Sequence, residues 1–292
     1  MPTICRLVLI ACLASVSACG ATTMGSSDQE SLSVSPVNTT FVVGGNRISI
    51  ALLDSQRNPV HASDVAARVR SPAGRLLSSI TLHDIAPEYG DIPVYVGVAT
   101  FRDAGQYELL VTARGDRGRA LTGHAFITVS VKTPNIALGE HVPLVHQPVL
   151  GDAGVTLAAI DSGVPPDNWH TATIADGVAQ HRPMVLYFGD PAYCPSKTCG
   201  PTHQIVEELC ARYCSQMLFE HIETYYPAGP PGANAHVNPA FTAFGLQTDP
   251  WVYFVNAEGV VADAYEGPVT LVELEQSAVG TLAGRVPAVS LS

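Results

Sequence analysis

The chain has 292 residues, of which 47% are hydrophobic and 14% charged, and its formal net charge is −11. A chain of this length exceeds one typical domain and predicts two. An acidic chain is repelled by nucleic acid and by anionic lipid, so nucleic-acid binding and electrostatic docking on membranes are excluded as its function.

The first residues have the pattern of a secretion signal. Arg6 forms a short positive region, and residues 7–16 form an apolar stretch too short to span a bilayer. Residues 16–20 are Val-Ser-Ala-Cys-Gly, which resembles the lipobox of bacterial lipoproteins. The resemblance implies a signal peptide over residues 1–18, lipidation of Cys19, and attachment to a membrane of the cell envelope on its extracytoplasmic side. An ordinary secretion signal with an incidental cysteine is the alternative.

Residues 19–31 are rich in Ser, Thr, Gly and Gln, which predicts a flexible tether. Short apolar strands with turn signals between them follow. These strands are expected at residues 41–53, 65–69, 76–82, 95–101, 107–112 and 125–131. Strands at this spacing are typical of an all-β sandwich, so we expect an immunoglobulin-like sandwich domain over residues 32–131.

Residues 132–168 contain five prolines and little periodicity, which predicts a linker that can pack on the second domain. Helical and strand patterns alternate after it. Helices are expected at 173–180, 200–213, 238–244 and 269–280, with strands at 184–188, 217–224, 251–256 and 260–265. This order predicts a compact α/β domain over residues 169–284, and we expect residues 169–292 to fold alone.

Two of the four cysteines that follow Cys19, Cys194 and Cys199, lie between the strand 184–188 and the next helix. A thiol at a helix N-terminus has a lowered pKa, and the thiolate is the reactive form. Lys197, one of only two lysines in the chain, favours the thiolate as well. The segment indicates thiol–disulfide chemistry, with Tyr193 as the aromatic side chain beside the nucleophile. A structural disulfide that clamps the loop is the alternative.

The order of elements after residue 169, with cysteines behind the first central strand, resembles the thioredoxin superfamily. Residues 244–254 look like the family's segment that ends in a cis-proline, which Pro250 matches, and residues 255–261 are similar to its hairpin. The resemblance covers residues 169–284. It implies a thioredoxin-like fold, exchange with protein thiols or disulfides of the envelope, a substrate-positioning role for Pro250, and no cofactor. The whole chain also resembles lipid-anchored bacterial proteins that place a β-sandwich before such a domain.

The cysteine spacing departs from this family. Thioredoxins separate their two cysteines by two residues, whereas four residues separate Cys194 from Cys199. In the preferred alignment, Cys194 attacks and Cys199 resolves within an expanded loop. In the other, residues 199–202 form the active-site turn, Thr202 takes the place of the resolving cysteine, and Cys194 is an upstream partner. Both alignments allow the two sulfurs to bridge.

Cys210 and Cys214 share one flank of the expected helix with His203 and Glu207. These residue types suggest zinc or copper, but a stripe over three turns brings only two of them to one ion. A second disulfide near the helix end, or partly buried thiols, is the preferred interpretation, and no metal is expected.

The predicted function is a lipid-anchored thiol–disulfide oxidoreductase outside the cytoplasm, with Cys194 and Cys199 as the couple. Two other classes stay open. A copper-handling protein of the Sco type combines a thioredoxin fold with two cysteines and a distant histidine, which here is His236 or His221. A non-catalytic binding module of the envelope uses the sandwich and keeps the disulfide as a structural link.

Overall fold

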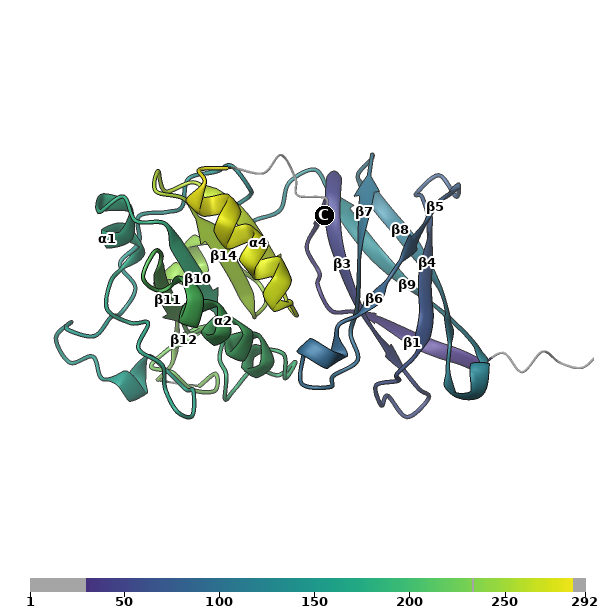
Figure 1. Ribbon diagram of the computed structural model, residues 1–292, viewed down its shortest axis with the longest axis horizontal. Coiled ribbons are helices and arrows are strands. Elements are labelled where there is room, and N and C mark those ends of the chain that lie inside the picture. Colours follow the sequence, from purple (N-terminus) through teal and green to yellow (C-terminus); the bar gives the residue numbers. More distant parts are fainter. Residues whose placement is uncertain (1–29, 233, 286–292) are drawn as a thin grey trace, which may run out of the picture.

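The computed structural model describes residues 30–232 and 234–285, and most of its strands belong to two sheets (Figure 1). The expected signal peptide, the lipidated Cys19 and most of the expected tether lie outside the described residues. The predicted tether, residues 19–31, overlaps the first strand by two residues, because this strand begins at Glu30. None of the helices in the described part has the length and apolar character needed to span a membrane.

The first sheet has nine strands in the described residues and is nearly closed, since its edge strand β5 lies beside β7, the neighbour of the other edge strand β6. Its order is β5-β4-β8-β9-β1-β3-β7-β6, with β2 paired to β9. The strands are β1 (Glu30–Pro36), β2 (Phe41–Val42), β3 (Gly44–Leu53), β4 (Ser63–Arg70), β5 (Leu76–Thr81), β6 (His83–Asp84), β7 (Tyr95–Phe101), β8 (Gly105–Arg114) and β9 (Ala120–Ser130). Two short 3-10 helices, η1 (Ala86–Glu88) and η2 (Asp116–Gly118), lie between strands. The expected all-β character of this region is confirmed.

No strand is predicted from the sequence at β1, where serines alternate with apolar residues. Leu32 and Val34 are nevertheless buried, so the alternation is that of a half-buried strand. It runs antiparallel to β3 and parallel to β9, which joins strands from the two ends of the region.

The second sheet has the order β11-β10-β14-β15. Its strands are β10 (Met184–Phe188), β11 (Leu218–Ile222), β14 (Trp251–Val255) and β15 (Val261–Glu266), and the helices are α1 (Ile174–Ala179), α2 (Cys199–Tyr213), α3 (Pro239–Ala243) and α4 (Leu271–Leu282). The C-terminal part of the chain also contains the short 3-10 helix η3 (Leu157–Ala159) and a separate two-stranded sheet, formed by β12 (Tyr225–Tyr226) and β13 (His236–Val237). β10 is parallel to β11 and antiparallel to β14. The expected α/β order is present, and so is the cis peptide bond at Asp249–Pro250.

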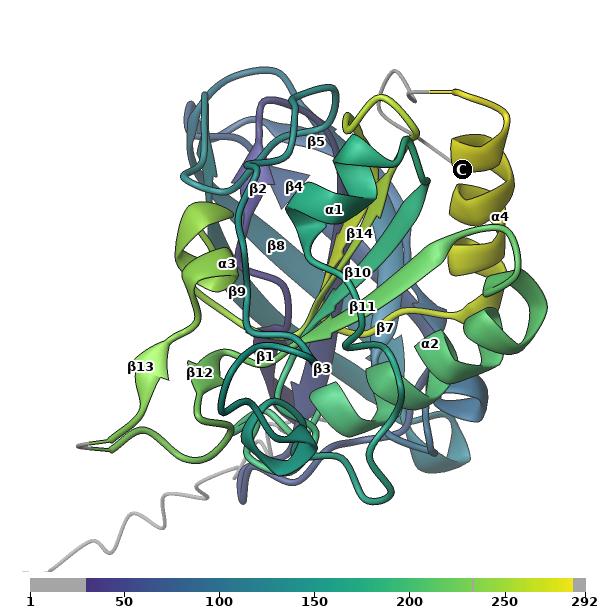
Figure 2. The ribbon, with the colours of Figure 1, turned by 90° about the vertical axis from the view of Figure 1, so that its left-hand side faces the viewer.

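Helices cover both faces of this sheet (Figure 2). Val185 and Tyr187 of β10 pack on the face covered by α2 and α4. Met184, Leu186 and Phe188 pack on the opposite face, with α1 and α3. All five residues are fully buried, which explains why β10 is a continuous apolar run rather than an alternating one.

The segment 132–168, expected as a linker, lies along the second sheet and belongs to its core. The backbone N–H of Val142 donates to the carbonyl of Gly259, and Gly139 donates to Val261 in the same way. Val142 is buried in the cluster that also contains residues of α1 and α3. The segment therefore closes the second core rather than spacing two independent units.

The first sheet also contributes to the second core. Ile85, Tyr89, Val94 and Val96 are buried in the same apolar cluster as the inner residues of α2 and α4. Arg47 adds a two-pronged ion pair with Glu273 of α4, at 2.7 Å from Nε and 3.0 Å from Nη2. The helix η1 lies next to α2 in this region (Figure 1).

These contacts predict different behaviour for two fragments of the C-terminal part. Residues 132–292 keep Val142 and the strand-like contacts with residues 259–261, whereas residues 169–292 lose them. We expect the longer fragment to unfold cooperatively in urea and at a higher midpoint than the shorter one. Equal midpoints for the two fragments, measured by far-ultraviolet circular dichroism, would show that residues 132–168 contribute nothing to folding.

Candidate functional site

A disulfide joins Cys194 to Cys199, with the two Cα atoms 6.0 Å apart, where the chain passes from β10 into α2. A second disulfide joins Cys210 to Cys214 near the other end of α2, with a Cα separation of 4.7 Å. The preferred interpretation of the second pair is therefore confirmed. The two cysteines of the stripe with His203 and Glu207 are thus bonded to each other.

The two sulfur-bearing residues of the first bridge differ in exposure. Cys199 is fully buried, whereas Cys194 is half-buried in the loop before the helix. Tyr193 is 45% exposed next to Cys194, and Lys197 is exposed in the same loop. A macromolecule that approaches this surface therefore meets Cys194 and Tyr193 first.

Backbone hydrogen bonds hold the loop against the end of β10. The carbonyl of Asp190 accepts from the N–H groups of Tyr193 (3.1 Å) and Cys194 (2.9 Å), and its carboxylate accepts from the N–H of Thr224 (2.6 Å). Asp190 is thus a turn residue. Lys197 has a positive φ of 59°, and its N–H donates to the carbonyl of Cys194 at 3.2 Å. Its effect on thiol reactivity stays a prediction.

Cys199 is the first residue of α2, so its sulfur lies at the positive end of the helix. Two tyrosines position this helix start. The hydroxyl of Tyr187 in β10 donates to the carbonyl of Cys199 at 2.9 Å. The hydroxyl of Tyr89, from the first sheet, donates to the carbonyl of Thr198 at 2.6 Å and lies 2.7 Å from the hydroxyl of Thr202. Thr202, the second alignment's counterpart of the resolving cysteine, is therefore engaged with the first sheet.

Asp249 is the titratable group nearest the buried sulfur. Its Oδ2 lies 3.1 Å from Sγ of Cys199, and the cis-linked Pro250 follows it. Burial and the negative charge of Asp190 raise the pKa of Asp249 to about 6. Sequence reasoning missed this residue, although it lies in the segment compared with the thioredoxin family. The signal was its place directly before Pro250.

The histidines suggested as copper ligands do not join the sulfurs. Among the described residues, the potential metal ligands that cluster around the bridge are Cys194, Cys199 and Asp249, and no histidine belongs to this cluster. His221 is buried and points its two ring nitrogens toward Asp167 (2.8 Å) and the carbonyl of Gly189 (3.0 Å).

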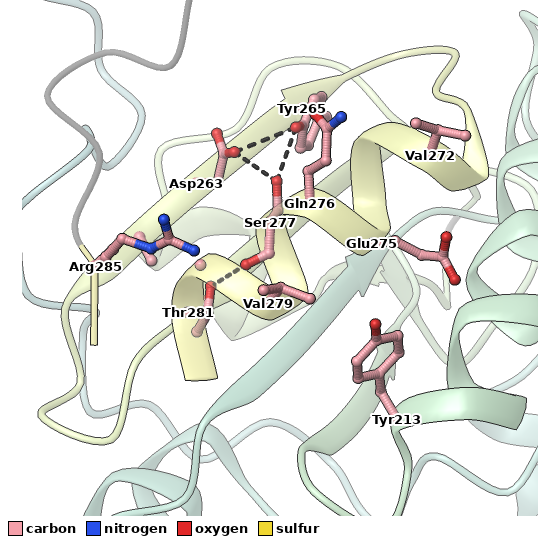
Figure 3. Close-up of a pocket in the computed structure, with 12 residues that line it drawn as sticks. Tyr213, Asp263, Tyr265, Val272, Glu275, Gln276, Ser277, Val279, Thr281 and Arg285 are labelled. Carbon is pink, nitrogen blue, oxygen red and sulfur yellow. Dashed lines mark hydrogen bonds between the residues drawn. The ribbon is translucent and has the colours of Figure 1, made fainter. Parts of the chain in front are cut away.

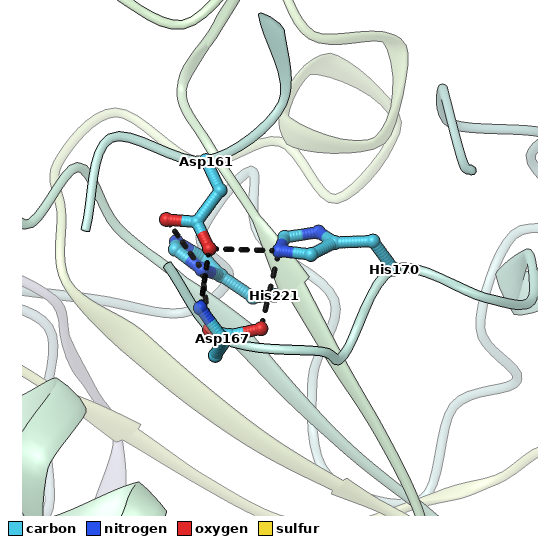
Figure 4. Close-up of side chains that lie close together, drawn as sticks. All are labelled: Asp161, Asp167, His170 and His221. Carbon is cyan, nitrogen blue, oxygen red and sulfur yellow. Dashed lines mark hydrogen bonds and ion pairs between the residues drawn. The ribbon is translucent and has the colours of Figure 1, made fainter. Parts of the chain in front are cut away.

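A second group of titratable side chains lies beneath the thiol loop. Asp161, Asp167, His170 and His221 each offer one ligand-type atom, and these atoms lie within 4.8 Å of one another (Figure 4). All four residues are almost completely buried at their side chains. Sequence reasoning did not connect them, because the aspartates come from the segment expected as a linker.

A surface pocket of about 570 Å³ lies along α4 (Figure 3). A hydrogen-bonded set of Asp263, Tyr265 and Ser277 forms part of its wall, and Tyr213 at the end of α2 forms another part. α2 has 15 residues and is therefore about 22 Å long, so this pocket lies at the end of the helix remote from Cys199.

No protein-family model matches the sequence, and no curated protein matches it either. Solved structures similar to parts of the chain include a thiol:disulfide interchange protein of the thioredoxin family from Chlorobium tepidum TLS, with 16% identity, 45% of this chain and 99% of that chain covered, and a TM-score of 0.29. dsbF of MTB covers 43% of this chain and 96% of its own, with 18% identity and a TM-score of 0.28.

Another part of the chain is similar to CopC from Methylosinus trichosporium OB3b. That structure covers 33% of this chain and 93% of its own, with 11% identity and a TM-score of 0.25. The structural neighbours thus include thioredoxin-family disulfide oxidoreductases, each of which covers less than half of this chain. Similarities of this size identify no function, so the proposal below depends on the geometry of the site.

The contact between Asp249 and Cys199 predicts how the reduced thiol titrates. Above pH 6 the carboxylate is charged, and a like charge beside the sulfur disfavours the thiolate. We expect Asp249→Asn to lower the pKa of the Cys199 thiol by about one unit. The measurement is the ultraviolet absorbance of the thiolate against pH, in a Cys194→Ser background that leaves Cys199 as the free thiol of the loop.

Asp116→Asn is the matched control, because Asp116 is exposed in η2 of the first sheet and its loss should leave the thiol titration unchanged. An unaltered thiol pKa in Asp249→Asn would show that the carboxylate does not act on the sulfur.

Proposed function

We propose that this protein catalyses thiol–disulfide exchange with protein thiols or disulfides outside the cytoplasm. The observation that carries the proposal is the asymmetry of the Cys194–Cys199 bridge. One sulfur-bearing residue is accessible from the surface, while the other is buried at the start of α2 beside a carboxyl group. A bridge with a purely structural role needs neither a cysteine that is accessible from the surface nor an acid beside the buried one.

The difference in exposure between the two cysteines supports a different role for each. In the reduced protein, the thiolate of Cys194 attacks one sulfur of a substrate disulfide, forms a mixed disulfide and releases the other substrate sulfur as a thiolate. The thiolate of Cys199 then attacks Sγ of Cys194. The bridge of this structure forms, the bound substrate sulfur leaves as a second thiolate, and the substrate is reduced by two electrons that the cysteine pair supplies. The reverse sequence oxidises a substrate dithiol.

Asp249 serves the second step. Its carboxylate, 3.1 Å from Sγ of Cys199, accepts the proton of the Cys199 thiol as that sulfur attacks. A pKa near 6 lets the group accept a proton at neutral pH and return it in the reverse direction. The N-terminus of α2 stabilises the negative charge of Cys199 when it is the leaving group.

Three further residues have roles in this proposal. Tyr193 offers an exposed ring for contact with substrate next to Cys194. Pro250 follows the acid that touches Cys199, and in this proposal the backbone next to it pairs with an extended substrate segment. Lys197 favours the Cys194 thiolate by a modest amount, on the order of half a pKa unit, because its ammonium is exposed.

Cysteine variants test the assignment of roles. Cys199→Ser should accumulate mixed disulfides between Cys194 and substrate proteins, because the resolving thiol is gone. Cys194→Ser should accumulate few, because its remaining thiol is buried. The complexes are detected by non-reducing electrophoresis of envelope extracts, after acid quenching and alkylation.

Other outcomes revise the proposal in defined ways. Strong trapping by Cys194→Ser instead would reverse the roles and favour the alignment in which residues 199–202 form the active-site turn. If neither variant traps substrate, and the wild-type bridge resists dithiothreitol in the folded state, the disulfide is structural. Stoichiometric copper binding that either cysteine variant loses, without exchange activity, would favour copper handling.

Membrane attachment through Cys19 is part of the proposal, and the motif at residues 16–20 supports it. We expect Cys19→Ala to appear in the soluble fraction or as an uncleaved precursor, because the acylated residue is lost. Cell fractionation with metabolic labelling by a fatty acid measures both results. Cys12→Ala is the control, since that cysteine lies inside the apolar stretch and should not affect retention. Normal membrane retention of Cys19→Ala without label would exclude a lipid anchor.

A further inference from the structure

Two carboxylates and two imidazoles meet in the interior below the thiol loop. Nε2 of His170 lies 3.1 Å from Oδ2 of Asp161 and 3.1 Å from Oδ1 of Asp167. Nδ1 of His221 lies 2.8 Å from Oδ2 of Asp167 and 3.8 Å from Oδ1 of Asp161. Side-chain exposure in this group of four does not exceed 4%. Buried charges of this kind are stable only when they are paired or coordinate a metal.

The hydrogen bond made by Nε2 of His221 determines whether Nδ1 of the same ring carries a proton or a lone pair. Nε2 lies 3.0 Å from the carbonyl oxygen of Gly189, which accepts hydrogen bonds only, so Nε2 carries the proton. A neutral His221 therefore turns a lone pair on Nδ1 toward the lone pairs of Asp167. Two lone pairs at this separation repel each other. A positive charge, either a proton or a metal ion, must lie between them.

We propose that Asp161, Asp167, His170 and His221 bind one Zn²⁺ ion. Two imidazole nitrogens and two carboxylate oxygens form a donor set that zinc accepts in tetrahedral coordination, with bonds of about 2.0–2.1 Å and neighbouring donors about 3.3 Å apart. The contacts between the imidazole nitrogens and the carboxylate oxygens are 2.8 to 3.8 Å long, and one ligand atom from each of the four residues lies within 4.8 Å of the other three. The inward convergence of these side chains is visible in Figure 4.

Surrounding groups hold the four ligands in place, as is usual around bound zinc. His203 of α2 donates from Nε2 to Oδ2 of Asp167 at 2.8 Å. The backbone N–H of Gly163 donates to Oδ1 of Asp161 at 2.6 Å, and that of Trp169 donates to Oδ1 of Asp167 at 2.7 Å. Each carboxylate is thus oriented from outside, and each keeps lone pairs for an ion.

The site connects three segments that are far apart in the sequence. The residues Asp161, Asp167 and His170 come from the segment before α1, and His221 comes from β11. His221 also bonds Gly189, which directly follows β10 and precedes the loop of Cys194. Zinc at this position ties the loop base to the sheet. This inference does not depend on the proposed exchange activity.

A proton is the competing occupant. Burial lowers the pKa of His170, but its contacts with Asp161 and Asp167 outweigh burial and raise that pKa to about 9. A network of protonated imidazoles binds no metal, so metal content separates the two cases.

The experiment uses the full mature chain with both disulfides closed, as shown by a free-thiol assay. The protein is stripped with a chelator, dialysed, titrated with Zn²⁺, and analysed by inductively coupled plasma mass spectrometry. We expect one zinc per chain and a higher melting temperature after loading. Co²⁺ as a probe should give the visible bands of tetrahedral nitrogen and oxygen coordination without a thiolate charge-transfer band.

Variants identify the ligands. Asp161→Asn should lose stoichiometric zinc, and His203→Gln should weaken affinity about 10- to 100-fold, because it removes an orienting contact. The matched control is the double variant His146→Asn/Asp152→Asn. It removes an exposed pair of the same residue types, 3.0 Å apart, and should keep one zinc. The double variant Cys194→Ala/Cys199→Ala should keep it as well.

Two results would overturn the proposal. One is a folded wild-type chain, verified by circular dichroism, that takes up no zinc or cobalt with its disulfides closed. The other is zinc that Asp161→Asn retains and Cys194→Ala/Cys199→Ala loses, which would place the metal on the thiol pair. Neither result bears on whether the cysteine variants trap substrate proteins.

Discussion

The burial of β10 on both faces is the constraint on which the site depends. Tyr187 and Phe188 are fully buried on opposite faces, so the end of the strand cannot shift without exposing one of them. Gly189 follows, where any side chain would collide with the ring of Tyr187. From that fixed point the hydroxyl of Tyr187 reaches the carbonyl of Cys199. This hydrogen bond fixes the position of the start of α2, and of the buried Cys199 sulfur, relative to the sheet.

Two aspartates near the thiol loop have opposite electrostatic environments. Burial and the charge of Asp190 raise the pKa of Asp249, so this group exchanges protons near neutrality. Burial also opposes the charge of Asp167, but hydrogen bonds from His170, His203 and His221 outweigh it and lower that pKa. The difference comes from the partners of each carboxylate rather than from its depth. One acid is therefore suited to proton transfer and the other to holding a cation.

The first sheet is part of the site's construction rather than an accessory to it. Tyr89 places its hydroxyl between the carbonyl of Thr198 and the hydroxyl of Thr202, in the first turn of α2. The ion pair of Arg47 with Glu273 joins the same sheet to α4. Any movement of the first sheet relative to the second is thus transmitted to the helix that begins with Cys199.

Local patterns in the sequence were sufficient for most elements of the two sheets, though not for β1 and β6, and for the cysteine bridge at the start of α2, because periodicity, turn residues and strand–helix junctions are local signals. The cis peptide at Pro250 followed from a short motif. The sequence did not reveal the pairing of Asp249 with Cys199, 50 residues apart, or the meeting of Asp161 and Asp167 with His221. Those side chains lie in irregular segments, where no period assigns them to a face. Only the packing of these segments against β10, β11 and α2 decided which charges would meet.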